Sequence, residues 1–212
     1  MSDSQIITIS REYGSGGRMI GKKLAEKLGV VFYDYKIIEM AAKQSGLSEN
    51  FMIGAEEKTS VGLLYSLSSL ASFGYSMSLN DQVFIAQSNV IREIAEKGSC
   101  VIVGRCADFI LKDNPNCIHF FIHADISRRT QLAKELYSLK EEKAEAEVKK
   151  IDKQRSAYYN HYTHQKWGQA SNYHLTIDSG LIGTDGAVEV IEKFIRSIND
   201  SKTSGARLYA EK

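Results

Sequence analysis

Three glycines near the N-terminus stand between an apolar run and a helical pattern. The run is residues 6–9, which are mostly isoleucine, and the pattern is residues 20–28, where apolar side chains recur every four positions. Gly14, Gly16 and Gly17 lie between them. Glycine adopts positive φ without strain and has no Cβ, so backbone N–H groups at the start of a helix can turn toward an anion. The spacing predicts a strand, a phosphate-binding loop and a helix.

The loop departs from the phosphate-loop pattern G-x-x-x-x-G-K-[ST] at several positions. Aligning Gly16 with the second glycine of the pattern puts Arg11 where the first glycine belongs and Gly17 where the lysine belongs. Arg18 follows directly, so we expect its side chain to carry positive charge toward the β- and γ-phosphates. Ser15 has the one hydroxyl inside the loop and is the candidate ligand for a magnesium ion. The alternative is a glycine-rich turn with nothing bound.

The composition fits a small anionic ligand better than a polymer. The chain has 212 residues, 43% of them hydrophobic, and a net charge of +1. That length is sufficient for one domain with a full core, and the charge argues against a surface for a nucleic-acid polymer. Cys100, Cys106 and Cys117 form no CxxC pair, which indicates buried free thiols in a reducing compartment. The first residues do not resemble a signal peptide, so we expect a cytoplasmic location.

Five apolar runs predict the strands of one sheet. They are residues 6–9, 30–33, 100–103, 118–122 and 174–177. Helical patterns fill the gaps, and strands that alternate with helices predict an α/β fold with a parallel sheet covered on both faces. Ligands bind such sheets beyond the carboxyl ends of the strands. We expect the glycine loop to meet Asp34, Arg105 and residues 125–129 at that edge.

Two stretches interrupt this alternation. Residues 35–80 are too long for a simple crossover helix between the second and third strands. Within them, residues 59–80 carry no charge, but serines and glycines dilute their hydropathy, so we expect a buried or partner-facing helical pair and not a membrane span. Residues 139–155 are rich in Glu and Lys, which predicts a solvated helix with an ion pair between Glu145 and Lys149.

Several motifs occur in a recognisable order along the chain. They are ISREYGSGGR in the glycine loop, VGRCADFIL at residues 103–111, Ser-Arg-Arg at 127–129, and Asp152 with Arg155 three residues later. In this order they resemble the cytidylate kinase-like family of nucleoside monophosphate kinases, over nearly the whole chain to about residue 199. The resemblance implies one domain, 1–199, with a three-layer P-loop NTPase fold and a five-stranded parallel sheet. It also implies an acceptor-binding insertion at about 35–80, a lid at about 128–157 and a polar tail at 200–212.

Carried over by position, the resemblance assigns roles to individual residues. The donor phosphates of ATP would be held by Gly14, Ser15, Gly16, Gly17 and Arg18. The acceptor would be held by Asp34, Arg105, Asp108, Asp152 and Arg155. The catalytic cations would be Arg18, Arg128, Arg129 and Arg155, with the lid's hinge near Arg128 and Arg129. The family's Gly-Arg-Asp and Asp-Ser-x-Arg motifs are altered here, because Cys106 and Lys153 replace the Asp and the Ser.

Arginines suit this chemistry because phosphoryl transfer needs alignment and positive charge more than a nucleophilic side chain. Each assignment also has a structural alternative. Arg105 could form a salt bridge at a strand end, residues 128–129 could lie on a solvated helix face, and Asp152 could pair with Arg155 on the surface. Asp34 could help to organise magnesium or could cap the helix that follows it.

The resemblance therefore implies a kinase that uses ATP and Mg²⁺ to phosphorylate a nucleoside monophosphate, with CMP or dCMP as the first candidates. Two alternatives stay open: a kinase of the same fold for another small acceptor, and a nucleotide-sensing protein that lost transfer together with the loop lysine. The expected partners are small nucleotides, with no nucleic-acid polymer and no membrane. The sequence leaves a homo-oligomer open.

Overall fold

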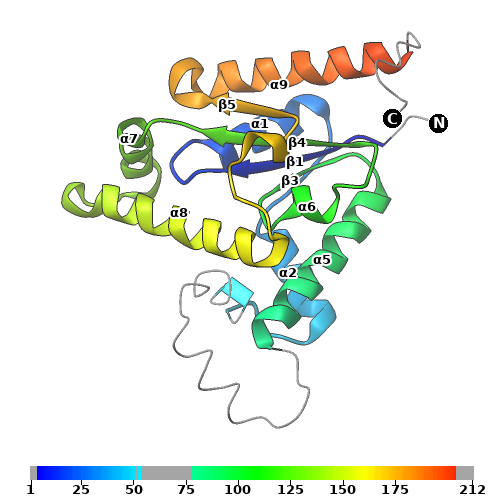
Figure 1. The fold of residues 1–212 in the computed structure, drawn as a ribbon, viewed down its shortest axis with the longest axis horizontal. Coiled ribbons are helices and arrows are strands. Elements are labelled where there is room, and N and C mark those ends of the chain that lie inside the picture. The colour runs from blue at the N-terminus through cyan, green and yellow to red at the C-terminus, as the bar shows by residue number, and fades with distance from the viewer. Residues whose placement is uncertain (1–3, 51, 54–77, 204–212) are drawn as a thin grey trace.

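A five-stranded parallel sheet lies at the centre of the fold (Figure 1). The computed structural model describes residues 4–50, 52–53 and 78–203. The strands are β1 (Ile6–Arg11), β2 (Val31–Tyr33), β3 (Cys100–Val103), β4 (Cys117–His123) and β5 (Leu175–Asp178), in the spatial order β2-β3-β1-β4-β5. All five predicted strands are present, and each neighbouring pair is parallel. The α/β fold class is therefore confirmed.

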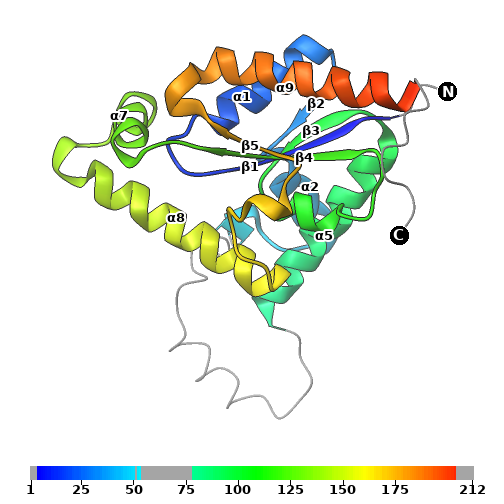
Figure 2. The same ribbon diagram turned by 45° about the horizontal axis from the view of Figure 1, so that its top comes forward.

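Helices cover both faces of the sheet, which makes three layers (Figures 1 and 2). One face carries α1 (Gly17–Leu28) and α9 (Ser179–Thr203), and the other carries α2 (Lys36–Ser45), α5 (Leu79–Lys97) and the short α6 (Ala107–Ile110). A 3₁₀ turn, η1 (Ala170–Asn172), precedes β5. Two further helices of the described part of the chain are α7 (Ile126–Tyr137) and α8 (Glu141–Thr163). Figure 1 shows α7 and the start of α8 at the end toward which the strand arrows point.

The two-residue period of the strands divides the core into two clusters. Ile6 and Ile102 pack with α2 and α5, whereas Ile7, Ile9 and Val103 pack with α1 and α9. All five side chains are at most 1% exposed. Because successive side chains in a strand point to opposite faces, a continuous apolar run supplies both clusters at once. This explains why the strands read as unbroken apolar runs in the sequence.

The predicted helical stretches correspond to observed helices where the structure describes them. α5 ends at Lys97, just before Gly98, and the Glu- and Lys-rich stretch forms most of α8. The predicted pair of Glu145 and Lys149 is confirmed, with 2.5 Å between the carboxylate and the ammonium nitrogen. The helical pair predicted at residues 59–80 lies mostly outside the described part of the chain, because residues 59–77 are not described. Among the helices that are described, none is long and apolar enough to cross a membrane.

A polar contact interrupts the apolar packing between β1 and β4. His119 lies directly across from Thr8, and its Nδ1 is 2.7 Å from the Thr8 hydroxyl oxygen. The backbone N–H of His119 donates to Nδ1 of His174, and the two rings stack with centroids 5.0 Å apart. His119 is 5% exposed, and this burial lowers its pKa from 6.5 to about 4. The imidazole is therefore neutral in the folded protein at neutral pH.

This buried histidine predicts acid sensitivity. Between about pH 6.5 and pH 4 the unfolded chain binds a proton at His119 that the folded protein does not. The contribution of this group to the free energy of unfolding is therefore fully present above pH 6.5 and is lost as the pH drops toward 4. The loss from this group should reach about 3 kcal/mol, at about 1.4 kcal/mol for each unit of pKa difference. Urea unfolding at several pH values should show a flatter profile for His119→Gln. The exposed His161, changed to Gln, is the control, and an equal flattening there would contradict the assignment.

Candidate active site

The glycine-rich loop forms the turn that the sequence predicts between β1 and α1. Gly14 and Gly16 have φ values of 78° and 76°, which glycine adopts without strain. A Cβ on Gly14 would lie 2.3 Å from the carbonyl oxygen of Arg129, so position 14 also lacks room for a side chain. Gly16 precedes α1, and no side chain caps the N-terminus of this helix. The first N–H groups of a helix have no acceptor within the helix, and an anion can satisfy them.

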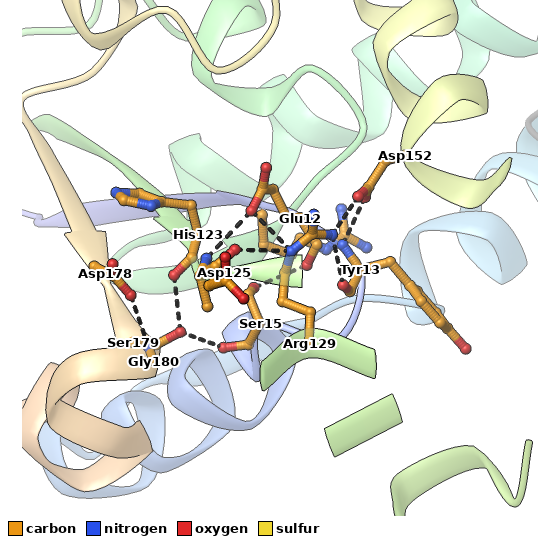
Figure 3. Close-up of polar contacts among 12 residues, drawn as sticks. Glu12, Tyr13, Ser15, His123, Asp125, Arg129, Asp152, Asp178, Ser179 and Gly180 are labelled. Carbon is orange, nitrogen blue, oxygen red and sulfur yellow. Dashed lines mark hydrogen bonds and ion pairs between the residues drawn. The ribbon is translucent and has the colours of Figure 1, made fainter. Parts of the chain in front are cut away.

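The buried side chain of Arg129 contacts the backbone and an acidic side chain of the loop (Figure 3). Nη1 of Arg129 donates to the carbonyl oxygen of Tyr13 at 3.1 Å and forms an ion pair with Asp152, and its Nε lies 3.1 Å from a carboxylate oxygen of Glu12. Asp152 also accepts a hydrogen bond of 2.7 Å from the backbone N–H of Tyr13. Burial raises the pKa of Glu12, and the charge of Arg129 partly offsets this rise. The loop, α7 and α8 thus share one ionic cluster.

The loop is also attached to the start of α9. The hydroxyl of Ser179 lies 2.7 Å from the carbonyl oxygen of Ser15 and 3.0 Å from that of His123 (Figure 3). Ser15 is 1% exposed, and its own hydroxyl donates to the carbonyl oxygen of Glu12 at 2.8 Å. The Ser15 hydroxyl would have to turn away from Glu12 to reach a metal. Within the described part of the chain, no group of three or more His, Cys, Asp or Glu side chains could hold a metal ion.

The resemblance implies a magnesium ion, and the described residues at this edge form no preformed cage of protein ligands for one. Mg²⁺ keeps several waters and binds substrate phosphates through few protein ligands, so a site without a preformed cage is compatible with it. The oxygen-bearing side chains at this edge include Ser15 and Asp34, and both already have protein partners in the structure. The fit is thus to a metal held mainly by phosphates and water.

A second ionic group lies at the end of β2. Asp34 is buried, and its two carboxylate oxygens lie 2.5 Å from Nε of Arg18 and 3.3 Å from Nη1 of Arg105. Both guanidinium groups also lie over the ring of Tyr35, at 5.3 and 5.8 Å from its centroid. Cation–π contacts of this kind add to the ion pairs in holding the arginines. Asp34 therefore fixes two cations beside an exposed aromatic ring. The N-cap residue of α2 is Tyr35, and no side chain, that of Asp34 included, donates or accepts a capping hydrogen bond there.

The chain after β3 has an unusual backbone. Gly104, Arg105 and Cys106 all have positive φ, at 77°, 53° and 54°. For residues with a Cβ this left-handed region is disfavoured by roughly 1–2 kcal/mol each. Such strain persists where the surrounding structure holds it, and it concentrates at functional sites. Here it directs the buried side chain of Arg105 back toward Asp34.

Asp108 lies deeper than the other acidic candidates. It is 3% exposed, and its two oxygens accept hydrogen bonds from Ser10 at 3.1 Å and from Tyr159 at 2.7 Å. Burial raises its pKa, and the two hydroxyl donors oppose that rise. The contacts join β1, α6 and α8. This arrangement favours a role for Asp108 in positioning these elements over direct contact with an acceptor.

The remaining candidates divide between the loop and the surface. Nη1 of Arg155 donates to the carbonyl oxygen of Arg11 at 3.1 Å, and its guanidinium lies 5.4 Å from the ring centroid of Tyr13. Burial lowers the pKa of Arg155. Arg128 is exposed on α7 and lies beside Gly180. The structure therefore places Arg155 against the loop, whereas Arg128 faces solvent.

The sequence predicts that most of these residues meet at one edge of the sheet, but it does not indicate several of the residues that contact them. Tyr13, Tyr35 and Ser179 contact the candidate residues, and nothing in their spacing marked them. The sequence marks Arg11 only as a departure from the loop pattern. The one sequence signal that could have indicated a role for Arg11 is that positions 11 and 17 both depart from the pattern. Asp152 accepts a hydrogen bond from the backbone of Tyr13, and Arg155 donates one to the carbonyl oxygen of Arg11, so both side chains contact the loop and the surface-pair alternative does not describe them.

The buried position of Arg129 leads to a stability prediction. Replacing it in Arg129→Met would leave two carboxylates without their common cation, and this should lower the free energy of unfolding by about 2–4 kcal/mol. Arg128→Met is the matched control, because the neighbouring arginine is exposed, and should change stability by less than about 0.5 kcal/mol. Urea denaturation measures both. Equal stability of the two variants would show that the cluster does not hold the loop.

Comparisons with known proteins agree with this geometry. The model of the cytidylate kinase-like family matches residues 6–181. The chain is similar to the crystal structure of an uncharacterized protein from Eubacterium ventriosum ATCC 27560, with 34% identity, a TM-score of 0.70, and coverage of 92% of this chain and 99% of that one. No curated protein gives a significant match.

More distant solved structures share the fold. A shikimate kinase from Acinetobacter baumannii, solved with shikimate, is 16% identical with a TM-score of 0.50, and covers 92% of this chain and 94% of its own. A shikimate kinase from Bacteroides thetaiotaomicron is 13% identical with a TM-score of 0.52, and covers 91% and 98%. At this identity the likeness is one of fold, and it agrees with the P-loop kinase architecture. The match of the family model over most of the chain shows that the protein belongs to the cytidylate kinase-like family.

Proposed function

We propose that this protein transfers the γ-phosphoryl group of ATP to a nucleoside monophosphate, with CMP or dCMP as the first candidates. The observation that carries the proposal is the pairing of two phosphate-type sites at one edge of the sheet. The uncapped helix start after the glycine loop suits the donor phosphates, and the arginines held by Asp34 suit a phosphate on the acceptor. Family membership supports a kinase.

The acceptor side would comprise Arg18, Arg105 and Tyr35. Two guanidinium groups held by a single carboxylate are already oriented before a ligand arrives, so little side-chain entropy is lost on binding. A planar guanidinium matches two oxygens of a phosphate. The exposed ring of Tyr35 lies beside both cations and offers a flat surface for the ligand. The acceptor-binding insertion that the resemblance implies, at about residues 35–80, would belong to the same side of the site.

In the proposed reaction an oxygen of the acceptor phosphate attacks the γ-phosphorus, and the bond to the β-phosphate oxygen breaks to release ADP. The attacking oxygen is already anionic, so no general base is required. Backbone N–H groups of the loop and the surrounding arginines would stabilise the charge on the transferred group. Magnesium, bound with ATP, would supply charge neutralisation at the β- and γ-phosphates. Arg155 lies against the loop and would help to align the two substrates.

A second candidate is a kinase that phosphorylates a hydroxyl group. Asp34 favours it, because a buried carboxylate at the acceptor side could take the proton of an attacking hydroxyl. The fold is shared with kinases whose names specify shikimate, an acceptor of this type. The two candidates therefore differ in what they require of Asp34.

The function can be tested with the purified chain, radiolabelled ATP and magnesium. The acceptor panel should contain CMP, dCMP, UMP, AMP, GMP and shikimate, and the products should be separated by chromatography. We expect labelled CDP or dCDP to form fastest. Labelled shikimate phosphate would replace the first proposal by the second, and ATP binding without transfer to any acceptor would favour the nucleotide-sensing alternative.

The variant Asp34→Asn separates the two chemistries. With a phosphate acceptor the carboxylate only positions Arg18 and Arg105, so we expect kcat/KM to fall by about tenfold, which corresponds to about 1.4 kcal/mol. With a hydroxyl acceptor the loss of a general base should lower kcat by about 10²–10⁴-fold. The control is Asp113→Asn, an exposed carboxylate away from the site. A large loss of kcat with CMP would contradict the base-free mechanism.

A further inference from the structure

We propose that Arg11, and not Arg18, supplies the positive charge that the loop lysine carries in the usual phosphate-loop pattern. The inference rests on the proposed function for its catalytic part, and it concerns a residue that lies outside every role assigned above. In the pattern, a lysine directly after the second glycine reaches the β- and γ-phosphates. This chain has Gly17 at that position and an arginine at the position of the first glycine.

The first observation is that the side chain of Arg11 fills the space next to Gly17. A Cβ built on Gly17 would lie 2.6 Å from Cβ of Arg11 and 3.0 Å from its Cγ. Real Cβ atoms do not approach other atoms this closely, so Gly17 has no room for a lysine while Arg11 is present. The two departures from the pattern are therefore one exchange, in which a cation at position 11 replaces a cation at position 17.

The second observation concerns the far end of the Arg11 side chain. A Cβ built on Gly104 would lie 2.0 Å from Nη1 of Arg11 and 2.9 Å from its Cζ. The guanidinium group thus lies directly against the backbone of Gly104, at the carboxyl end of β3. Gly104 has a φ of 77°, and its N–H donates to the carbonyl oxygen of Ile9. A side chain at either glycine would displace Arg11.

These contacts place the arginine between the two phosphate-type sites. Its side chain passes from the start of α1 to the end of β3, and the next residue after Gly104 is Arg105, which belongs to the acceptor side. The carbonyl oxygen of Arg11 accepts a hydrogen bond from Arg155. This is the strand edge beyond which ligands bind in open α/β sheets. A group transferred from donor to acceptor must pass this edge.

Arg18 is placed differently, although it follows Gly17 directly. Its Nε is 2.5 Å from Asp34, and its side chain is 54% exposed. It therefore serves the acceptor side, where the carboxylate holds it. Arg11 also suits the chemistry, because a guanidinium group keeps its charge at all relevant pH values and binds two phosphate oxygens at once.

The experiment compares three variants with the full-length wild type. They are Arg11→Met, the exchange variant Arg11→Gly/Gly17→Lys, and Arg18→Met. Lys22→Met is the control, because it removes an exposed cation from the same helix as Arg18. Calorimetric titration with ATP and magnesium gives a readout that does not depend on transfer, and kcat with the best acceptor gives the second. Melting temperatures identify any variant that fails to fold.

We expect Arg11→Met to weaken ATP binding by at least tenfold, to lower kcat by about 10²-fold or more, and to lose more ATP affinity than Arg18→Met. The exchange variant should bind ATP at least tenfold more tightly than Arg11→Met, because a lysine then stands in its usual place. Wild-type ATP affinity in Arg11→Met, or a larger loss in Arg18→Met, would overturn the proposal, even if the exchange variant does not fold. A wild type that binds ATP but transfers to no acceptor would refute the proposed function alone, since the binding comparison still tests Arg11.

Discussion

The buried guanidinium of Arg129 is the contact on which the geometry of the phosphate loop depends. It neutralises Glu12 and Asp152 and binds the backbone of Tyr13, while its own carbonyl oxygen occupies the space that a side chain at Gly14 would need. Charges taken out of water are stable only when they are paired and hydrogen-bonded. The loop therefore cannot take another shape without exposing or separating these charges. The same contact joins the loop to α7 and α8, which contain the predicted lid at about 128–157.

The candidate site follows a consistent electrostatic rule. Glu12 and Asp152 share Arg129, and Asp34 is shared by Arg18 and Arg105. Carboxylates that hold arginines in fixed positions prepare a site for phosphate groups, because the cations need little rearrangement when charge develops. The carboxylates also limit the repulsion between closely spaced cations before a ligand binds. The site is thus organised by its acidic residues as much as by its arginines.

The fold itself could be predicted in some detail. All five strands and the main helices appear where periodicity placed them, because a strand buried on both faces needs an unbroken apolar run and a covering helix needs one apolar stripe. The contact of Arg18, at the end of the glycine loop, with Asp34, and of Asp34 with Arg105, also agrees with expectation. Parallel strands bring their carboxyl ends to one edge, so this convergence follows from the order of the elements along the chain.

Roles of individual side chains could not be predicted in the same way. Arg128 and Arg129 are neighbours in the sequence, yet one is exposed and the other is 8% exposed within an ionic cluster. Consecutive helical residues point about 100° apart, and only the packing of α7 against the loop decides which of them is buried. Asp108 likewise follows Arg105 closely, but it contacts Ser10 and Tyr159, whereas Arg105 contacts Asp34.

By itself, the amino-acid sequence determined the sheet, the helices that cover it and the glycine-rich turn between β1 and α1, because these depend on local conformation and on hydrophobic periodicity. Only the tertiary structure decided which cation reaches which part of the site. Arg11 lies against Gly104 and Arg155 lies against Arg11, although 93 and 144 residues separate the members of these pairs. Such contacts depend on the directions of side chains from distant elements, and no local pattern in the sequence encodes them.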